Sequence, residues 1–420
     1  MTAADTHRAI HAVWRIERAK LIAGLTRLTG DVGLSEELAQ DALVAALENW
    51  PSTGVPEKPG AWLMAIAKRR AIDLFRRARM QDRKHEDIGY DLRHDELAMP
   101  DPEAALDNDI DDDLLRLIFI SCHPVLPIEA QVALTLRLLG GLTTDEIARA
   151  FLVPEPTIAQ RIVRAKRKLN EARVAFELPH GADRAERLTA VLGVIYLIFN
   201  EGYSASSGSE WIRRPLCDEA MRLGRILAGL ATDEPEVHGL VALMEIQASR
   251  FAARTGPEGE PILLLDQDRS RWDTLLIRRG LAALGRAESA ARPAGPYTLQ
   301  AAIAACHARA VRAEDTDWKR IAALYSILAH VSPSPIIELN RAVAVAMAFG
   351  PQAGLEIVDG LRDQSVLASY HLLPSVRGDF LFKLGRKPEA RAEFERAAQL
   401  TQNIRERRLL LERAAACGPE

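Results

Sequence analysis

The sequence predicts an all-α protein that is divided into several helical domains. Hydrophobic residues make up 48% of the chain and charged residues 27%, which is typical of globular proteins. Aromatic residues reach only 5%, alanine and leucine are abundant, and apolar residues recur every three or four positions, which favours helices over strands. A chain of 420 residues exceeds the size of one compact core, so we expect two to four domains.

The overall charge and the cysteines exclude several classes of protein. A net charge of −4 argues against a general polyanion binder but leaves room for local basic patches. The four cysteines are scattered without a CxxC pair, so we expect no disulfide framework, no metal site and no cofactor. No apolar run reaches the ~18 residues that cross a bilayer, and no apolar signal segment opens the chain. We therefore expect a cytoplasmic protein without membrane contact.

The first 80 residues predict three helices. The first covers 6–29, and the second begins at Ser35 as its N-cap, with acidic residues in its first turn. Its polar positions, which we expect to face solvent, are Glu37, Gln40, Asp41 and Glu48. Prolines and glycines make 50–60 a loop, and the third helix covers 61–80.

The third helix combines aromatic and basic residues. We expect its apolar side to hold Trp62, Leu63, Ile66, Leu74 and Phe75. Its basic residues are Lys68, Arg69, Arg70, Arg76, Arg77 and Arg79. Such a helix can bind single-stranded DNA, because cations follow the phosphates and rings stack on the bases. A solvated amphipathic helix with buried aromatic side chains is the alternative, and the helix alone leaves both open.

Residues 81–113 predict a flexible acidic linker, rich in Asp, Glu and His and containing two prolines. Its DxDxD pattern lacks the glycine and the distant glutamate of a calcium loop, so we predict no metal site there. Helices resume at 114–121 and 128–139.

Residues 141–170 predict two short helices joined by a tight turn. Thr144 is expected to cap the first helix, and Pro154 and Pro156 mark the turn. The second helix buries Ile158, Ile162 and Leu169 and exposes Gln160, Arg161, Arg164, Lys166, Arg167 and Lys168. This pattern indicates a helix-turn-helix whose second helix reads DNA. An ordinary helical hairpin with a solvated basic face is the alternative.

Three stretches together resemble one protein family. Residues 37–50, ELAQDALVAALENW, resemble the region 2 helix of bacterial sigma factors that docks on the RNA polymerase clamp. Residues 61–79, AWLMAIAKRRAIDLFRRAR, resemble the helix that melts and reads the −10 promoter element. Residues 142–169 resemble region 4, which reads the −35 element. Their order, and the acidic linker in place of a third sigma domain, resemble the extracytoplasmic-function group (group 4) of the sigma-70 family.

The resemblance implies a domain layout and roles for particular residues. It makes 1–80 region 2, 81–113 the linker and 114–175 region 4. Contacts with core RNA polymerase, at its clamp and flap, would involve Glu37, Gln40, Asp41 and Glu48. The −10 element would meet Lys58, Trp62, Arg69, Arg70, Asp73, Arg76 and Arg77. The −35 element would meet Thr157, Gln160, Arg161, Arg164, Arg167 and Lys168. No catalytic residue is implied, because the polymerase core holds the active site.

Two positions depart from the family pattern. Arg69 stands where the family often has asparagine, and the turn before the second helix has Pro154 and Pro156 where the family commonly has serine and glycine. These differences bear on the promoter sequence more than on the activity.

The remaining residues predict further helices. Residues 200–208, NEGYSASSG, form either a loop that binds a small ligand through backbone amides or a plain connection. A Gly/Pro-rich break precedes 263–272, LLLDQDRSRW. The segments that begin at Gly350 and Gly385 lie 35 residues apart and resemble tetratricopeptide repeats, whose period is ~34 residues.

We therefore expect a helical extension over 180–330 and a tetratricopeptide-like domain over 331–420. Such repeats form a concave surface for a peptide or protein partner, although a helical domain without a groove is the alternative. In the resembling subgroup the extension regulates activity in place of a separate anti-sigma factor.

Two other functions compete with that of a sigma factor. One is a DNA-binding transcriptional regulator with a helical-repeat sensor domain that does not dock on polymerase, which would have no need of the 37–79 stretch. The other is an enzyme, but the histidines are scattered and no nucleophile elbow, phosphate loop or HExxH motif is present.

Overall fold

The structure is a computed structural model that describes residues 3–418 except 87–109, 152, 205–211, 258–259, 261 and 402. Those described residues form helices and no β-strand, which confirms the all-α prediction. The chain divides into two compact units, Met1–Val194 (unit 1) and Ile195–Glu420 (unit 2). The division falls inside one continuous helix, α8 (Gly181–Tyr203). None of the described helices is long and apolar enough to cross a bilayer.

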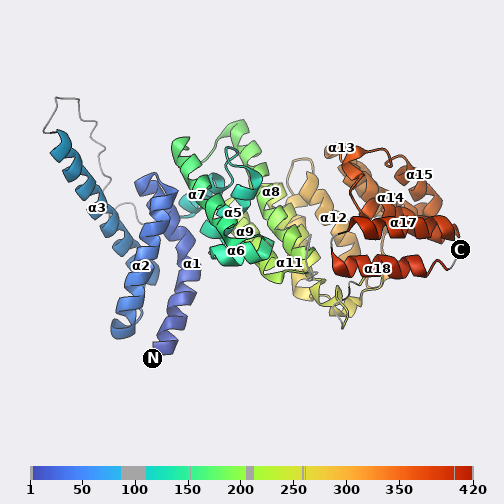
Figure 1. Cartoon of the computed structure of the whole chain (residues 1–420), viewed down its shortest axis with the longest axis horizontal. Helices are drawn as coiled ribbons and strands as arrows, with labels where there is room; N and C mark the ends of the chain where they lie inside the picture. The colour runs from blue at the N-terminus through green and yellow to red at the C-terminus, as the bar shows by residue number, and fades with distance from the viewer. Residues whose placement is uncertain are drawn as a thin grey trace. The chain divides into compact units, whose positions relative to one another are not determined.

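Unit 1 begins with three long helices, drawn in blue in Figure 1. They are α1 (Ala3–Thr29), α2 (Val32–Thr53) and α3 (Pro59–Glu86), and α1 packs on both of the others. Four shorter helices follow: α4 (Ile110–Ser121), α5 (Ile128–Leu138), α6 (Thr144–Phe151) and α7 (Glu155–Glu171). Within this second group α7 packs on α5 and α6, and α4 packs on α1 of the first group.

Two helix starts differ from the predictions by a few residues. The N-cap of α2 is Asp31, whose Oδ1 accepts a hydrogen bond from Leu34 N at 3.0 Å, and Ser35 lies buried inside the helix. The cap of α6 is Thr143, which exchanges hydrogen bonds with Glu146 in a capping box. In both places two nearby residues have similar preferences for the N-cap position, Asp31 and Ser35 for α2 and Thr143 and Thr144 for α6, and the earlier residue caps the helix.

The predicted loop at 50–60 is shorter in the structure. Helix α2 continues through Pro51 to Thr53, although proline has no N–H to donate to the preceding turn. Gly54 stops the helix in a conformation with φ of 84°, and its N–H donates to Trp50 O at 2.9 Å. Helix α3 then begins at Pro59.

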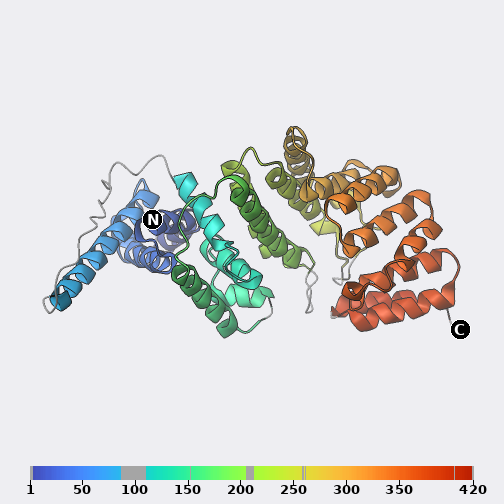
Figure 2. The ribbon, with the colours of Figure 1, turned by 90° about the horizontal axis from the view of Figure 1, so that it is seen from above.

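Unit 2 is a succession of helices that pack mainly on their neighbours in the chain. They are α9 (Arg214–Leu230), α10 (Pro235–Ala248), α11 (Thr274–Glu288), α12 (Pro296–Arg309), α13 (Trp318–Val331), α14 (Pro335–Phe349), α15 (Pro351–Asp359), α16 (Leu372–Lys383), α17 (Lys387–Leu400) and α18 (Ile404–Ala415). Short 3-10 turns lie at η1 (Phe251–Ala253), η2 (Arg269–Arg271), η3 (Ala313–Asp315) and η4 (Ser365–Leu367). Neighbour-on-neighbour packing is the arrangement of helical repeats, and Figure 2 shows it for the orange and red helices.

The last five helices share one apolar core. Its largest fully buried side chains are Phe380 and Phe394, from α16 and α17. Gly378 allows these two helices to approach, because a Cβ there would lie 2.9 Å from the Phe394 ring. A separate cluster joins α12, α13 and α14, so apolar packing continues across residue 331.

A close approach also fixes α12 against α10. The Glu236 carboxylate of α10 accepts hydrogen bonds from the backbone N–H groups of Tyr297 and Thr298, at the positive end of α12. Gly239, one turn further along α10, leaves room for this contact, since a Cβ there would lie 2.7 Å from Thr298 N.

We therefore expect Gly239→Ala to destabilise the protein by about 1–3 kcal/mol, because backbone atoms of α12 would have to move. Gly229→Ala is the matched control, since Gly229 lies in α9 and a Cβ added there would have open space within 4 Å. It should raise stability by up to about 1 kcal/mol through helix propensity. Thermal unfolding of the full chain measures both, and equal melting temperatures for the two variants would contradict the prediction.

Candidate functional site at the junction of α2, α5 and α7

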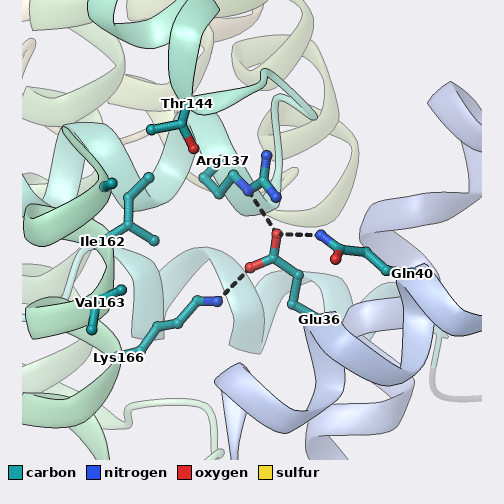
Figure 3. A pocket seen from close by; sticks show the side chains of 8 residues that line it. Glu36, Gln40, Arg137, Thr144, Ile162, Val163 and Lys166 are labelled. Carbon is teal, nitrogen blue, oxygen red and sulfur yellow. Dashed lines mark hydrogen bonds and ion pairs between the residues drawn. The ribbon is translucent and has the colours of Figure 1, made fainter. Parts of the chain in front are cut away.

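A single buried carboxylate joins the two helix groups of unit 1. Glu36 lies in the first turn of α2, and only 2% of the residue is exposed. Its Oε1 lies 2.9 Å from Arg18 Nη2 of α1 and 2.7 Å from Arg137 Nε of α5. Its Oε2 lies 2.5 Å from Lys166 Nζ of α7. Figure 3 shows the Arg137 and Lys166 contacts converging on Glu36.

The three cations make this burial tolerable. Burial by itself would raise the pKa of Glu36, but Lys166, Arg137 and Arg18 together lower that pKa below its ordinary value. An ionised carboxylate costs several kcal/mol to remove from water, and paired charges with good hydrogen bonds offset that cost. Glu36 therefore stays charged in the folded chain and serves as the counter-charge of all three cations.

A pocket of about 220 Å³ adjoins Glu36. Its lining consists of Glu36, Gln40, Arg137, Thr144, Ala159, Ile162, Val163 and Lys166 (Figure 3). The α7 residues among these recur at spacings of three and four, so they lie along one side of that helix. The pocket therefore lies where one side of the second helix of the helix-turn-helix faces α2.

Two further polar contacts tie the same helix groups together. At the end of α7, Asn170 Nδ2 donates to Asp31 Oδ2 at 2.8 Å, so the N-cap of α2 also holds α7. In α4, the buried Asp113 lies 3.4 Å from Arg27 of α1 and 2.7 Å from Arg116. Each group thus contributes one buried acid to cations of the other.

The predicted polymerase-binding residues all lie on the exposed side of α2: Glu37, Gln40, Asp41 and Glu48. Two of them also contact other parts of unit 1. Gln40 Nε2 donates to Glu36 Oε1 at 3.3 Å, beside the pocket. Asp41 lies 3.0 Å from Arg70 Nη1, which pairs a predicted polymerase contact with a predicted DNA contact.

Helix α3 carries an exposed basic surface. Exposed on it, or just before it, are Lys58, Arg69, Asp73, Arg76 and Arg77, while Arg70 is partly buried. Trp62 is also partly buried, and its ring meets that of buried Trp50 edge-on, with centroids 5.3 Å apart.

Leu74 and Phe75, which the sequence counts among the apolar positions of α3, do not belong to its buried side. They are 42% and 37% exposed, because the small side chains of Ala67 and Ala71 make the buried contacts. An exposed ring among arginines is the arrangement that stacks on unpaired bases.

Helix α7 presents a second exposed polar surface. Gln160, Arg164, Arg167 and Lys168 are exposed, and Thr157 and Arg161 are half-buried. The sequence predicts that Lys166 is exposed with them, but the structure turns it toward Glu36, with only 22% of its side chain accessible. Arg167 lies 3.4 Å from Glu171, one turn on.

Three members of this junction were not predicted from the sequence: Arg18, Glu36 and Arg137. Glu36 and Glu37 look equivalent as acids in a first helical turn. A signal existed at Arg137, which is an isolated charge in the otherwise apolar end of α5. Among the described residues no group of three potential metal ligands comes together.

Replacing Glu36 tests whether the junction is stabilising. We expect Glu36→Gln to lower the free energy of unfolding at pH 7 by about 3–5 kcal/mol, because three cations lose their buried counter-charge. The exposed neighbour supplies the control, so Glu37→Gln should change stability by less than about 0.5 kcal/mol.

The difference between wild type and Glu36→Gln should also depend on pH. The pKa of Glu36 is lowered by folding, so its stabilisation is complete above about pH 4.3 and is lost as the pH falls further. Denaturant unfolding between pH 3 and 7 measures this, and a difference that stays constant over that range would refute the assigned charge state.

Comparison with known families agrees with this layout. Residues 15–80 match sigma-70 region 2, and residues 116–169 match sigma-70 region 4. Residues 187–288 match a family of unknown function, DUF6596. No solved structure matches the chain.

The chain is similar to one relative over almost its whole length and to another over part of it. An uncharacterized protein of Rhizobium meliloti is 45% identical over 394 residues, which cover 93% of this chain and 91% of the relative. A probable ECF RNA polymerase sigma factor, SigI of Mycobacterium tuberculosis, is 28% identical over 40% of this chain and 57% of its own length. With regions 2 and 4 in order and a long helical continuation after them, the chain belongs to the sigma-70 family as an extracytoplasmic-function sigma factor with a C-terminal extension.

Proposed function

We propose that unit 1 reads a promoter with two separate surfaces while α2 holds core RNA polymerase. The observation that carries this proposal is the exposure of two polar surfaces, one on α3 and one on α7, in a chain whose two helix groups match regions 2 and 4. The polymerase core would carry out RNA synthesis, and this chain would select the start site.

The α3 surface suits an opened −10 element. Its contacts would come from Lys58, Trp62, Arg69, Arg70, Asp73, Arg76 and Arg77, with exposed Phe75 as an additional stacking ring. Guanidinium groups contact phosphates, and an aromatic ring stacks on bases of any sequence. Trp62 is held against Trp50, so it presents a fixed edge rather than a free side chain.

The α7 surface suits the major groove of a −35 element. Its contacts would come from Thr157, Gln160, Arg161, Arg164, Arg167 and Lys168. Arginine and glutamine form bidentate hydrogen bonds with base edges, and lysine contacts phosphates. The pocket side of α7 faces α2, so the Glu36 junction leaves Gln160, Arg164, Arg167 and Lys168 exposed.

We further propose that the Glu36 junction forms in the polymerase-free chain and breaks when α2 docks. Gln40 supports this proposal, because its side chain belongs to the predicted polymerase contact and at the same time donates a hydrogen bond to Glu36 beside the pocket. The Asp41–Arg70 ion pair also supports it, because Asp41 would be needed for the polymerase contact and Arg70 for the DNA contact. Polymerase binding would then supply the free energy that separates the two helix groups.

For unit 2 we propose a regulatory role, with the helical repeats as the surface for a protein or peptide partner. Helix α8 provides the connection, because it begins in unit 1 and continues into unit 2. Near its start, Arg187 Nη2 donates to Phe119 O of α4 at 3.3 Å, and the guanidinium lies 5.7 Å from the Phe119 ring centroid. A change in α8 would therefore reach the region 4 helices directly.

The polymerase contact can be tested by reversing a charge on α2. We expect Asp41→Arg to abolish co-purification with core polymerase and run-off transcription, because the exposed acids of α2 imply a basic docking surface on polymerase, which an arginine would repel. Asp145→Arg is the matched control: Asp41 and Asp145 have 55% and 54% of their side chains exposed, and each pairs with one arginine. Unchanged polymerase binding by Asp41→Arg would favour a DNA-binding regulator that does not dock.

The role of unit 2 can be tested by ending the chain after Tyr203, which keeps all of α8. We expect run-off transcription with core polymerase to change in amount but to begin at the same promoter, because regions 2 and 4 are intact. Full-length protein on the same template is the reference. If the amount and the promoter choice both stay the same, unit 2 is not regulatory.

A further inference from the structure

Arginine and aromatic side chains gather in unit 2 between the end of α8, the start of η1, and η2. The Arg254 guanidinium stacks on the Tyr203 ring, with Cζ 3.6 Å from the ring centroid. Arg250 Cζ lies 5.8 Å from the same centroid. Two cations thus share one ring, and burial together with the positive charge of Arg250 lowers the pKa of Arg254 below its ordinary value, although Tyr203 acts in the opposite direction.

A third arginine is held in place by the chain beyond α12. Arg269 Nη1 donates to the carbonyl oxygens of His307 and Ala310, at 2.7 Å each, and Nη2 donates to Thr316 Oγ1 at 3.1 Å. Its Cζ lies 4.9 Å from the Trp272 ring centroid. These contacts leave the guanidinium little freedom, so its Nε–H points in a fixed direction.

This cluster contains more positive charge than the described residues neutralise. None of their carboxylates forms an ion pair with Arg250 or Arg269, and only Glu314 and Asp315 act on Arg269 from further away. Elsewhere in unit 2 the buried charge is paired directly: Glu245 lies 2.7 Å from Arg225 and 3.5 Å from Arg279. Unpaired guanidinium groups that are partly buried are costly without an anion.

Unsatisfied polar atoms gather in the same place. Buried atoms without a hydrogen-bond partner among the described residues include Arg250 Nε, Arg269 Nε, Trp272 Nε1 and His307 Nδ1. His307 is 7% exposed, and burial, then Arg250 and Arg269, lower its pKa to about 4, so the ring is neutral at pH 7. Native proteins rarely leave several such groups together without water or an ion. Water would satisfy the hydrogen bonds but would not balance the charge.

We propose that this cluster, defined as Tyr203, Arg250, Arg269, Trp272 and His307, binds a small ligand through an oxyanion group. A phosphate or a carboxylate fits, because its oxygens accept the paired N–H donors of arginine in one plane. The Tyr203 and Trp272 rings would hold the Arg250 and Arg269 guanidinium groups in place beside the ligand through cation–π contacts. Its role as a signal rests on the regulatory function proposed for unit 2, but binding itself does not.

Calorimetric titration of the full-length protein with inorganic phosphate tests the site, with citrate titrated separately at matched ionic strength and sodium chloride as the blank. We expect saturable binding at one site per chain and a higher melting temperature. The stronger of the two titrants identifies phosphate or carboxylate as the preferred group. The absence of saturable binding of either would overturn the proposal.

Two substitutions and a control link binding to the cluster. Arg250→Gln should weaken binding at least tenfold, and Arg250→Lys should weaken it less, because it keeps the charge but loses the planar pair of donors. Arg408→Gln removes the same charge from an exposed ion pair on α18 and should bind like wild type. Circular dichroism and the unliganded melting temperature show whether each variant is folded.

Equal affinity in folded Arg250→Gln and wild type would overturn the proposal, as would equal weakening in Arg408→Gln. These titrations use no polymerase, so their failure would leave the sigma-factor function and the regulatory role untouched. Conversely, a truncation without effect on transcription would leave the binding site standing.

Discussion

Unit 1 depends on the burial of one charged carboxylate. Glu36 holds side chains from α1, α5 and α7 at distances of 2.5–2.9 Å, so helices far apart in the sequence meet at one point. A buried ion cluster contributes little net stability over an apolar core but penalises every arrangement that leaves a charge unpaired. The Glu36 junction therefore makes the contact between the two helix groups specific, and it is a contact that a competing surface could exchange.

The 17 residues of α7 form three sides with different surroundings. One side packs Ile158, Ile162, Ala165 and Leu169 into the core of the helix-turn-helix. A second side, with Val163 and Lys166, faces the pocket next to α2. The third side remains exposed, and it is the side that we propose to contact DNA. With 3.6 residues per turn, a helix can point three sets of side chains in different directions. The core and α2 can therefore both pack against α7 while its third side stays exposed.

Much of this arrangement could be predicted from the sequence, because helical periodicity and turn residues are local signals. The predictions failed, or made no choice, where neighbouring residues of one chemical type compete. Asp31 was used rather than Ser35, and Glu36 rather than its neighbour became the buried acid. Only a partner distant in the sequence decides such choices. Helix α3 shows that size does not decide burial either, because Ala67 and Ala71 occupy buried positions while Leu74 and Phe75 are exposed.

Helix α8 runs without a break through the division between the units, and residues on both sides of that division are buried, including Leu188, Val191, Ile198 and Phe199. Each residue of an α-helix advances the chain by about 100° around the axis. Inserting or deleting a single residue between Leu188 and Val191, which are both buried within unit 1, would turn one of these side chains about 100° away from the other. The turns of α8 that carry buried side chains therefore tolerate a change of length less well than the loops on either side of the helix.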